Sequence, residues 1–179
     1  MVHCHPCPDS LGAALRDAVL DGLGTAGATT HLINLYEEGF GPGADATVVA
    51  QHKAQLLACD RLVLVYPTWW GAQPAMLRSW FEQVWWQPAA QDAARSTGDN
   101  ARRYRNITRL TAVTTHGSPK WINAVQGESG KHFLQRRLRR SLGRRARVEW
   151  MALYDLDHEK PGDTDRFLVR VRERCARTG

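Results

Sequence analysis

The chain has 179 residues and a formal net charge of +6, carried by 20 arginines against 4 lysines. Apolar residues make up 43% and charged residues 23%, which is typical of a globular protein and excludes a disordered one. We therefore expect a single domain over residues 1–179. The basic charge alone is compatible with nucleic acid, an anionic membrane or a phosphorylated ligand.

Membrane and secretory classes are not indicated. The first residues lack the basic stretch and following apolar stretch of a secretory signal. No apolar run approaches the ~18 residues that a membrane span needs. The four cysteines do not form the pattern of a small disulfide framework. We expect a soluble, cytoplasmic protein with no membrane span.

In the first half of the chain, apolar residues recur at helical spacing from Leu11 to Ala26. Asp9 or Ser10 is available as the N-cap of this helix, and Gly27 follows its end. Residues 29–35 are β-rich, and a second helix is predicted over residues 46–58. Residues 61–66 are apolar after the first, as is typical of a central parallel strand covered on both faces.

The second half continues the alternation, with helices predicted over residues 75–86, around 133–142 and over 164–177, and strands over 107–115 and 148–153. With a short strand before His5, the chain has five strands and five helices. We predict an α/β fold: a flavodoxin-like, doubly wound, five-stranded parallel sheet of order 2-1-3-4-5, with helices on both faces. The first strand is unusually short for a central one.

Ligands of such a sheet bind outside the carboxyl ends of the strands, where the strand order reverses. The loop after the first strand reads His5-Pro-Cys-Pro-Asp-Ser10 and runs into a helix. Backbone N–H groups at a helix start offer an anion site, to which Ser10 adds a hydroxyl. An ordinary capping turn is the simpler alternative.

Two further loops at this edge carry unusual residues. The loop after the third strand contains Trp69 and Trp70 between prolines, and adjacent side chains cannot both face one core. Indole surfaces and backbone amides suit a flat, heteroatom-rich ring, although one indole packing beneath the loop is the alternative. The loop after the fourth strand offers hydroxyls, Gly117 and, as a lid, Trp121, unless it is an ordinary strand-to-helix turn.

These three loops resemble those of the flavodoxin-like NAD(P)H dehydrogenase (quinone) family. The first resembles its flavin loop through His-Pro-x-Pro-x-Ser, and the third matches its Thr-Thr-x-Gly. The most specific match spans residues 66–85, which read Tyr-Pro-Thr-Trp-Trp-Gly-x-x-Pro-Ala-Met-Leu-Arg-x-Trp-Phe-x-x-Val-Trp. The matches occur in the family's order and at its spacing.

The resemblance implies a tightly held FMN or FAD and a homodimer with active sites near the subunit interface. It also implies ping-pong hydride transfer, in which NAD(P)H reduces the flavin and a quinone-like acceptor reoxidises it. Trp70 and Trp121 would border the acceptor pocket. By position, the implied flavin contacts are His5, Ser10 and Leu11 for the ribityl and phosphate portion, Pro67, Thr68, Trp69, Trp70 and Gly71 for the isoalloxazine, and Thr114, Thr115, His116 and Gly117 for its polar edge.

The chain departs from the family pattern at several positions. Gly12 stands where the mammalian quinone reductases have Asn, and Trp121, which cannot act as an acid, stands at the position of a Tyr. The stretch Gly127-Glu-Ser-Gly130 lacks the family's histidine, so a Tyr/His relay is in doubt. His116 is a candidate catalytic replacement, against the simpler expectation of a solvated loop histidine. The polar stretch 88–106 lacks the family's aromatic run, which predicts a different substrate preference.

A thiol-redox protein is the first alternative. Cys4 and Cys7 form a C-x-x-C before a helix, which can signal a redox dithiol. However, Pro8 follows directly and helical spacing begins only near Leu11, so the helix dipole would reach the thiols poorly. An adventitious zinc site there is a weaker alternative, and no metal site is predicted.

The other two alternatives concern the partner. Arginines crowd residues 136–147 and could neutralise phosphates, but Leu134, Leu138 and Leu142 recur at helical spacing. This predicts an amphipathic helix with a solvated basic face, and we expect no nucleic-acid partner. An electron carrier that binds flavin but no substrate is the last alternative; the paired-Trp loop and the long polar stretch favour a covered pocket, and hence an enzyme.

Overall fold

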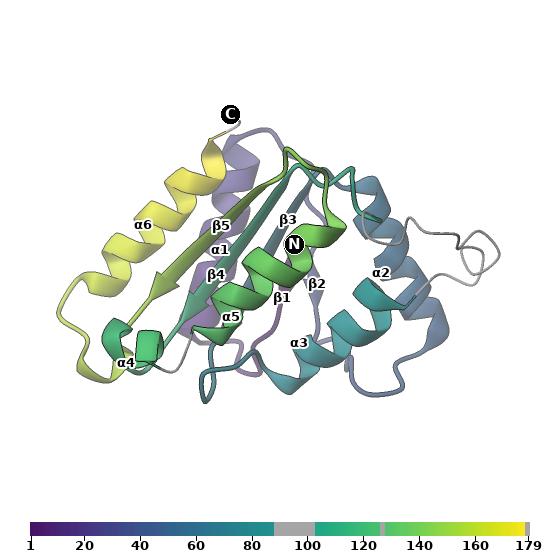
Figure 1. The fold of residues 1–179 in the computed structure, drawn as a ribbon. Helices are drawn as coiled ribbons and strands as arrows, with labels where there is room; N and C mark the ends of the chain where they lie inside the picture. The colour runs from purple at the N-terminus through teal and green to yellow at the C-terminus, as the bar shows by residue number, and fades with distance from the viewer. Residues whose placement is uncertain (88–102, 126–127, 178–179) are drawn as a thin grey trace.

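The computed structural model describes residues 1–87, 103–125 and 128–177. Its parallel sheet has five strands in the order β2-β1-β3-β4-β5 (Figure 1). The strands are β1 (Val2–His3), β2 (Ile33–Asn34), β3 (Arg61–Pro67), β4 (Arg109–Thr115) and β5 (Arg147–Leu153). The predicted flavodoxin-like strand order is confirmed.

Helices cover both faces of the sheet, as predicted (Figure 1). On one face, α1 (Leu11–Thr25) and α6 (Asp163–Ala176) enclose a mainly aliphatic core that also contains Phe167. The other face is covered by α2 (Ala46–Ala58), α3 (Ala75–Trp80), the π-helix η1 (Phe81–Trp86), α5 (Ser129–His132), the π-helix η4 (Phe133–Arg137) and the 3₁₀-helix η5 (Leu138–Ser141). Two short helices, α4 (Lys120–Val125) and η6 (Leu156–His158), complete the part of the chain that the structure describes.

The second strand is much shorter than the predicted residues 29–35. Among the strands of the described residues its one neighbour is β1, whose register pairs Val2 with Ile33 and His3 with Asn34. The β-rich sequence before Ile33 has no long β1 to pair with, so it enters the sheet as irregular chain. The shortness of β1 therefore limits β2 as well.

Two predicted helices change their winding along their length. Residues 75–86 form α3 and then the π-helical turn of η1, which buries Trp80, Phe81 and Trp85. The helix predicted around residues 133–142 is likewise divided into η4 and η5, and α5 directly precedes it. The spacing of apolar residues predicts which side faces the core, but it does not separate windings so close to 3.6 residues per turn.

Helices α1 and α6 are in backbone contact at Gly22. A Cβ atom at this position would lie 2.3 Å from the carbonyl oxygen of Arg172 and 2.7 Å from Cβ of Cys175. Arg61, the first residue of β3, donates from Nη1 to the carbonyl of Cys175 at 2.9 Å and so satisfies an acceptor in the last turn of α6. The last helix is thus fixed both to the first helix and to the start of a central strand.

Candidate functional site at the carboxyl edge of the sheet

The loops after β1, β3 and β4 emerge at the same edge because the strands are parallel. The amide of Thr68 donates to the carbonyl of Thr115 at 2.8 Å and joins the second loop to the third. The rings of His5 and Trp69, with centroids 6.4 Å apart, join the first loop to the second. The structure therefore brings together the three segments that sequence analysis identified.

The first loop is a capping turn built around His5. The Oγ of Ser10 accepts from the amide of Ala13 at 3.2 Å and donates to the carbonyl of Cys7 at 2.8 Å, while the amide of Cys7 donates to Nδ1 of His5 at 3.1 Å. The hydroxyl of Ser10 is thus used within the loop. The remaining attraction for an anion comes from the N–H groups in the first turn of the 15-residue α1.

Gly12, one of the departures from the family pattern, has a steric reason. A Cβ atom at this position would lie 2.8 Å from Cδ2 and 2.9 Å from Cγ of the His5 ring. The imidazole packs directly against the first turn of α1, which leaves no room for a larger residue. The position of the His5 ring therefore requires glycine at residue 12.

The second loop forms a tight turn that projects an indole into solvent. Trp69 and Ala72 exchange two backbone hydrogen bonds of 3.0 and 2.9 Å. The residues between them, Trp70 and Gly71, have φ values of 51° and 72°, a combination that non-glycine residues disfavour by about 1 kcal/mol or more. Trp70 is fully exposed and Trp69 is 40% exposed, so neither indole belongs to the core.

The third loop is held to the second through threonine hydroxyls. Thr114 is fully buried, and its Oγ1 lies 2.9 Å from Oγ1 of Thr68. The hydroxyl of Thr114 therefore faces Thr68 and not the surface. Gly117 faces Asp157, whose Oδ2 would lie 2.9 Å from a Cβ atom at the glycine.

His116 is buried, so the expectation of a solvated loop histidine is wrong. Its Nδ1 lies 2.8 Å from Oδ1 of Asn123, and the Nδ2 of that amide donates to the carbonyls of Ser118 and Pro119. This orientation places the proton of neutral His116 on Nδ1 and leaves Nε2 as an acceptor, 3.4 Å from Oγ1 of Thr68. Burial lowers the pKa of His116, although Asn123 and Glu128 act in the opposite direction, and this favours the neutral ring.

A tyrosine that the motif comparison missed packs on His116. The rings of Tyr154 and His116 are stacked, with centroids 4.6 Å apart and planes 19° apart. The hydroxyl of Tyr154 accepts from Nε1 of Trp150 and donates to Oε1 of Glu128, both at 3.2 Å. Burial raises the pKa of Tyr154. Tyr154 directly follows the end of β5 at Leu153, so the rule that sites lie at carboxyl ends could have identified it.

The start of α5 connects this cluster to the exposed turn. The hydroxyl of Ser129 donates to the carbonyl of Gly71. Glu128 accepts from Lys131 at 2.9 Å, and this hydrogen bond is the main cause of its lowered pKa. The turn that carries Trp70 is thus held from three separate segments, by the ring of His5, the carbonyl of Thr115 and the hydroxyl of Ser129.

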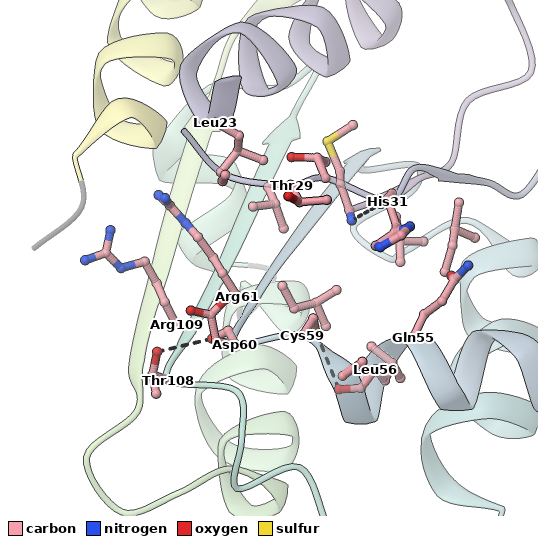
Figure 2. A pocket seen from close by; sticks show the side chains of 18 of the residues that line it. Leu23, Thr29, His31, Gln55, Leu56, Cys59, Asp60, Arg61, Thr108 and Arg109 are labelled. Carbon is pink, nitrogen blue, oxygen red and sulfur yellow. Dashed lines mark hydrogen bonds between the residues drawn. The ribbon is translucent and has the colours of Figure 1, made fainter. Parts of the chain in front are cut away.

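Cavity volume does not locate this site. The cleft lined by Gly71, His116 and Trp150 has a volume of about 10 Å³. A cavity of about 750 Å³ lies at the amino edge of the sheet (Figure 2), and one of about 740 Å³ runs along β5, where Trp150 and Tyr154 border it. The exposed indoles of Trp69 and Trp70, the buried His116 and the hydroxyl of Thr68 are at the carboxyl edge. A flat ring held between loops needs an open surface rather than a closed cavity, so the chemistry of the side chains outweighs volume here.

Further exposed apolar side chains lie beyond the third loop. Trp121 and Val125, both in α4, are 69% and 82% exposed. Residues 88–102 of the long polar stretch, and Gly127 of the departure noted above, lie outside the described residues.

The cysteine pair has the wrong environment for a redox dithiol. Cys4 is fully buried, and burial raises its pKa to about 12, whereas Cys7 is exposed. A thiolate at Cys4 is therefore strongly disfavoured. Among the described residues there is no cluster of three or more His, Cys, Asp or Glu that could hold a metal ion, and no helix is long and apolar enough to span a membrane.

The model of the flavodoxin-like fold family matches residues 1–170, and the chain belongs to this family. An uncharacterized NAD(P)H oxidoreductase, YcaK of Escherichia coli K12, is 30% identical over 99 residues, which are 48% of this chain and 50% of that relative. The chain thus matches about half the length of this curated relative.

Solved structures share the fold at low sequence identity. An NAD(P)H:quinone oxidoreductase from Methanothermobacter marburgensis superposes with a TM-score of 0.74 at 19% identity, over 98% of this chain and 93% of that chain. An FMN-dependent NADH-azoreductase from Bacillus anthracis, solved in complex with FMN, gives 0.70 at 15% identity, over 98% and 96%. These likenesses establish the fold.

Proposed function

We propose that this protein is a flavin-dependent NAD(P)H oxidoreductase that reduces quinone-like acceptors by ping-pong hydride transfer. The observation that carries the proposal is the joining of three loops at the carboxyl edge, with two exposed indoles in the second and, in the third, a buried histidine whose pKa is lowered by burial. The names of the relatives support an oxidoreductase, and they include both quinone reductases and azoreductases.

The residues at this edge fit a flavin. The first turn of α1 offers backbone donors to a phosphate beside His5 and Leu11. The turn from Trp69 to Ala72 presents an indole face for the isoalloxazine, and its strained backbone is fixed by Ser129, which binds the carbonyl of Gly71. FMN needs only this phosphate position, whereas FAD would need additional contacts.

When bound, the flavin would accept hydride from NAD(P)H and pass the electrons to the acceptor. The protein's own part concerns protons and water. Nε2 of His116 is the unprotonated ring nitrogen and lies 3.4 Å from Oγ1 of Thr68, so His116 would accept a proton on Nε2 and return it at the polar edge of the ring. Tyr154 holds the imidazole of His116 in place by stacking on it. Tyr154 does not form a hydrogen bond to Nε2 of His116, because its hydroxyl proton is donated to Glu128.

We further propose that two copies of the chain, each a single domain, form a homodimer that covers the site. Trp70, Trp121 and Val125 are exposed apolar side chains at or beside the site loops. Apolar side chains gathered near a site are typical of a surface that another molecule covers. A second copy would bury these indoles and complete the acceptor pocket.

Titration of the apoprotein with FMN and with FAD tests the flavin. We expect one of them to bind stoichiometrically, with a shifted flavin spectrum and a raised melting temperature. The flavin-loaded protein should then oxidise NADH or NADPH when a quinone or an azo dye is supplied. The compound class that gives the faster oxidation identifies the class of acceptor. Absence of binding by both flavins would contradict the proposal at its first step.

A flavin-binding electron carrier is the second candidate, favoured by the full exposure of Trp70 at the site. An exposed edge suits electron exchange with a protein partner. A carrier would bind flavin equally well but would not oxidise NAD(P)H without a separate reductase. Steady-state turnover by the purified, flavin-loaded protein therefore separates the two candidates.

A further inference from the structure

The outermost strand on one side of the sheet is β5 (Figure 1), and the cavity of about 740 Å³ runs along its free edge. On its other side β5 pairs with β4, and no described strand pairs with it at the free edge. The floor of the cavity is the strand from Val148 to Ala152. One wall is the exposed side of α6 from Arg170 to Arg177, and the opposite wall includes Lys131 of α5 and Gln135 of η4. The cavity thus lies where a sixth strand would continue the sheet.

The register of β5 shows which of its backbone groups face this cavity. The amide of Arg147 donates to the carbonyl of Thr108, and the carbonyl of Leu153 accepts from the amide of His116, both at 2.8 Å. Because consecutive residues of a strand bond alternately to either side, the odd-numbered residues of β5 bond to β4 and the even-numbered ones face the free edge. These even-numbered residues are Val148, Trp150 and Ala152. Their backbone amides and carbonyls have no hydrogen-bond partner in the part of the chain that the structure describes.

An added strand would meet two different walls, because its side chains point alternately to either face of the sheet. On the η4 side, the half-buried Val148 and Trp150 pack against the core and leave apolar surface at the cavity. On the α6 side, the exposed residues that line the cavity are all charged: Arg170, Glu173, Arg174 and Arg177. The cavity therefore suits a segment in which apolar and charged residues alternate.

The charges that line the cavity favour acidic residues in such a segment. Five cations line it against two carboxylates, Glu149 and Glu173. Of these carboxylates, Glu149 is already paired with Arg174. Three of the cations form no salt bridge with a described residue: Lys120, Arg170 and Arg177. Acidic side chains on the α6 side would be attracted by this excess of positive charge.

Two other occupants are less suited to the free edge of β5. A strand of the same chain placed beyond β5 after α6 would need a left-handed crossover, because α6 lies on the face of α1 whereas the crossovers toward β5 use the other face. A second copy docked through its own β5 would bring the same excess of cations against this one. The strand at the opposite side of the sheet, β2, has two residues to offer. Topology and charge therefore favour a segment of a different protein.

We propose that the free edge of β5 is a docking site for an extended segment of a partner protein in which acidic and apolar residues alternate. The segment adds a sixth strand to the sheet, with its backbone bonded to Val148, Trp150 and Ala152. Its acidic side chains face Arg170 and Arg177 on α6, and its apolar side chains cover the indole of Trp150. The inference does not depend on the flavin.

The test titrates the 179-residue protein with acetyl-Glu-Val-Glu-Val-Glu-Val-Glu-amide, a peptide of 7 residues like β5. We expect slower hydrogen exchange at the amides of Trp150 and Ala152, and no change at Glu149 and Met151, which are bonded to β4. A peptide of the same sequence with N-methylated interior residues keeps every charge but cannot donate backbone hydrogen bonds. It should bind at least about tenfold more weakly. Equal binding of the two peptides would mean that the cations attract any polyanion, and the strand proposal would be overturned.

Protein variants and a second ligand sharpen the outcome. Arg170→Gln and Arg177→Gln should each weaken the acidic peptide by roughly twofold to fivefold. The matched control is Arg172→Gln, which removes the same charge from an exposed position of α6 that does not line the cavity, and it should have a smaller effect. Equal weakening by all three variants would show that the peptide does not bind along β5. If pyrophosphate protects the same amides and displaces the peptide at lower concentration, the site takes a small anion and the docking proposal is wrong.

Discussion

Two groups of tryptophans, about ten residues apart in the chain, occupy opposite environments. Trp69 and Trp70 are 40% and 104% exposed, whereas Trp80 and Trp85 are 0% and 2% exposed. The first pair lies in a tight turn whose positive φ at Trp70 directs the indole outward. The second pair lies on the inward side of α3 and η1, against the sheet. Backbone geometry, and not residue type, decides which indoles serve the core and which are available to a ligand.

The largest effect is expected in the buried pair. Trp85 packs 4.4 Å from Tyr104 between ring centroids, and its Nε1 donates to Oγ of Ser141 at 3.2 Å. Trp85→Ala should lower the free energy of unfolding by about 3–5 kcal/mol, measured by denaturant titration. Trp85→Phe, which keeps a ring, should cost clearly less. If Trp85→Ala lowers the free energy of unfolding by less than about 1 kcal/mol, the buried pair does not stabilise the core as described.

The next effect concerns pH and the second buried indole. Nε1 of Trp80 donates to Nδ1 of His52 at 3.3 Å, and Nε2 of His52 lies 2.8 Å from Oε2 of Glu38. Burial lowers the pKa of His52 although Glu38 acts to raise it, and a proton on Nδ1 would face the indole N–H. The folded protein therefore binds this proton less readily than the unfolded chain.

The sign of the pH effect follows from this difference. The stability contributed by His52 is fully present above the ordinary histidine pKa of about 6.5 and is lost as the pH falls below it. We expect the loss to be at most about 1.4 kcal/mol per pH unit. Trp80→Phe removes the opposing donor, so its unfolding free energy should change less between pH 7.5 and 5 than that of the unmodified protein. Identical slopes would contradict the role given to the Trp80–His52 bond.

A smaller effect is expected at the exposed pair, and it concerns the ligand. Trp70→Ala should leave apoprotein stability within about 0.5 kcal/mol, because the side chain is fully exposed. Flavin affinity should fall by about 1 kcal/mol, or roughly fivefold, through loss of one stacking contact. Leu57→Ala, which removes a half-exposed side chain from α2, is the control and should leave flavin affinity unchanged. A strongly destabilised Trp70→Ala apoprotein would show that the indole belongs to the core.

The smallest effect is expected at the cysteines, which show the same contrast between an exposed and a buried side chain. Cys7 is exposed in the first loop, whereas Cys4 is buried beside it. Cys7→Ala should leave NAD(P)H-dependent reductase activity within a few-fold and stability within about 0.5 kcal/mol. Loss of activity in proportion to thiol modification would restore the dithiol alternative.

Much of the fold could be predicted because the strongly periodic apolar segments are bounded by residues typical of turns and helix caps. The predicted boundaries of α2 match those observed, and β3 was predicted from its continuous apolar run. The short β2 was not predictable, since local β propensity does not reveal whether a neighbouring strand is available. The π-helical turn of η1 also escaped prediction, because its apolar spacing resembles that of an α-helix.

The candidate site was predicted in part. Its three loops follow from topology and from the spacing of motifs, and the structure places them together. The burial of His116 was missed because it depends on Asn123 and Tyr154, which reach the histidine from α4 and from the end of β5. Contacts between distant segments are tertiary and leave no local pattern in the sequence.

The close contact at Gly22 has a consequence for synthesis of the chain. Residue Arg172 of α6, against which Gly22 packs, is made about 150 residues after the glycine. At translation rates of about 5–20 residues per second, the Gly22 surface of α1 waits roughly 8–30 seconds for α6. During that interval Leu15 and Val19 can already pack on Val63 and Val65 of β3, whereas the surface around Gly22 stays uncovered.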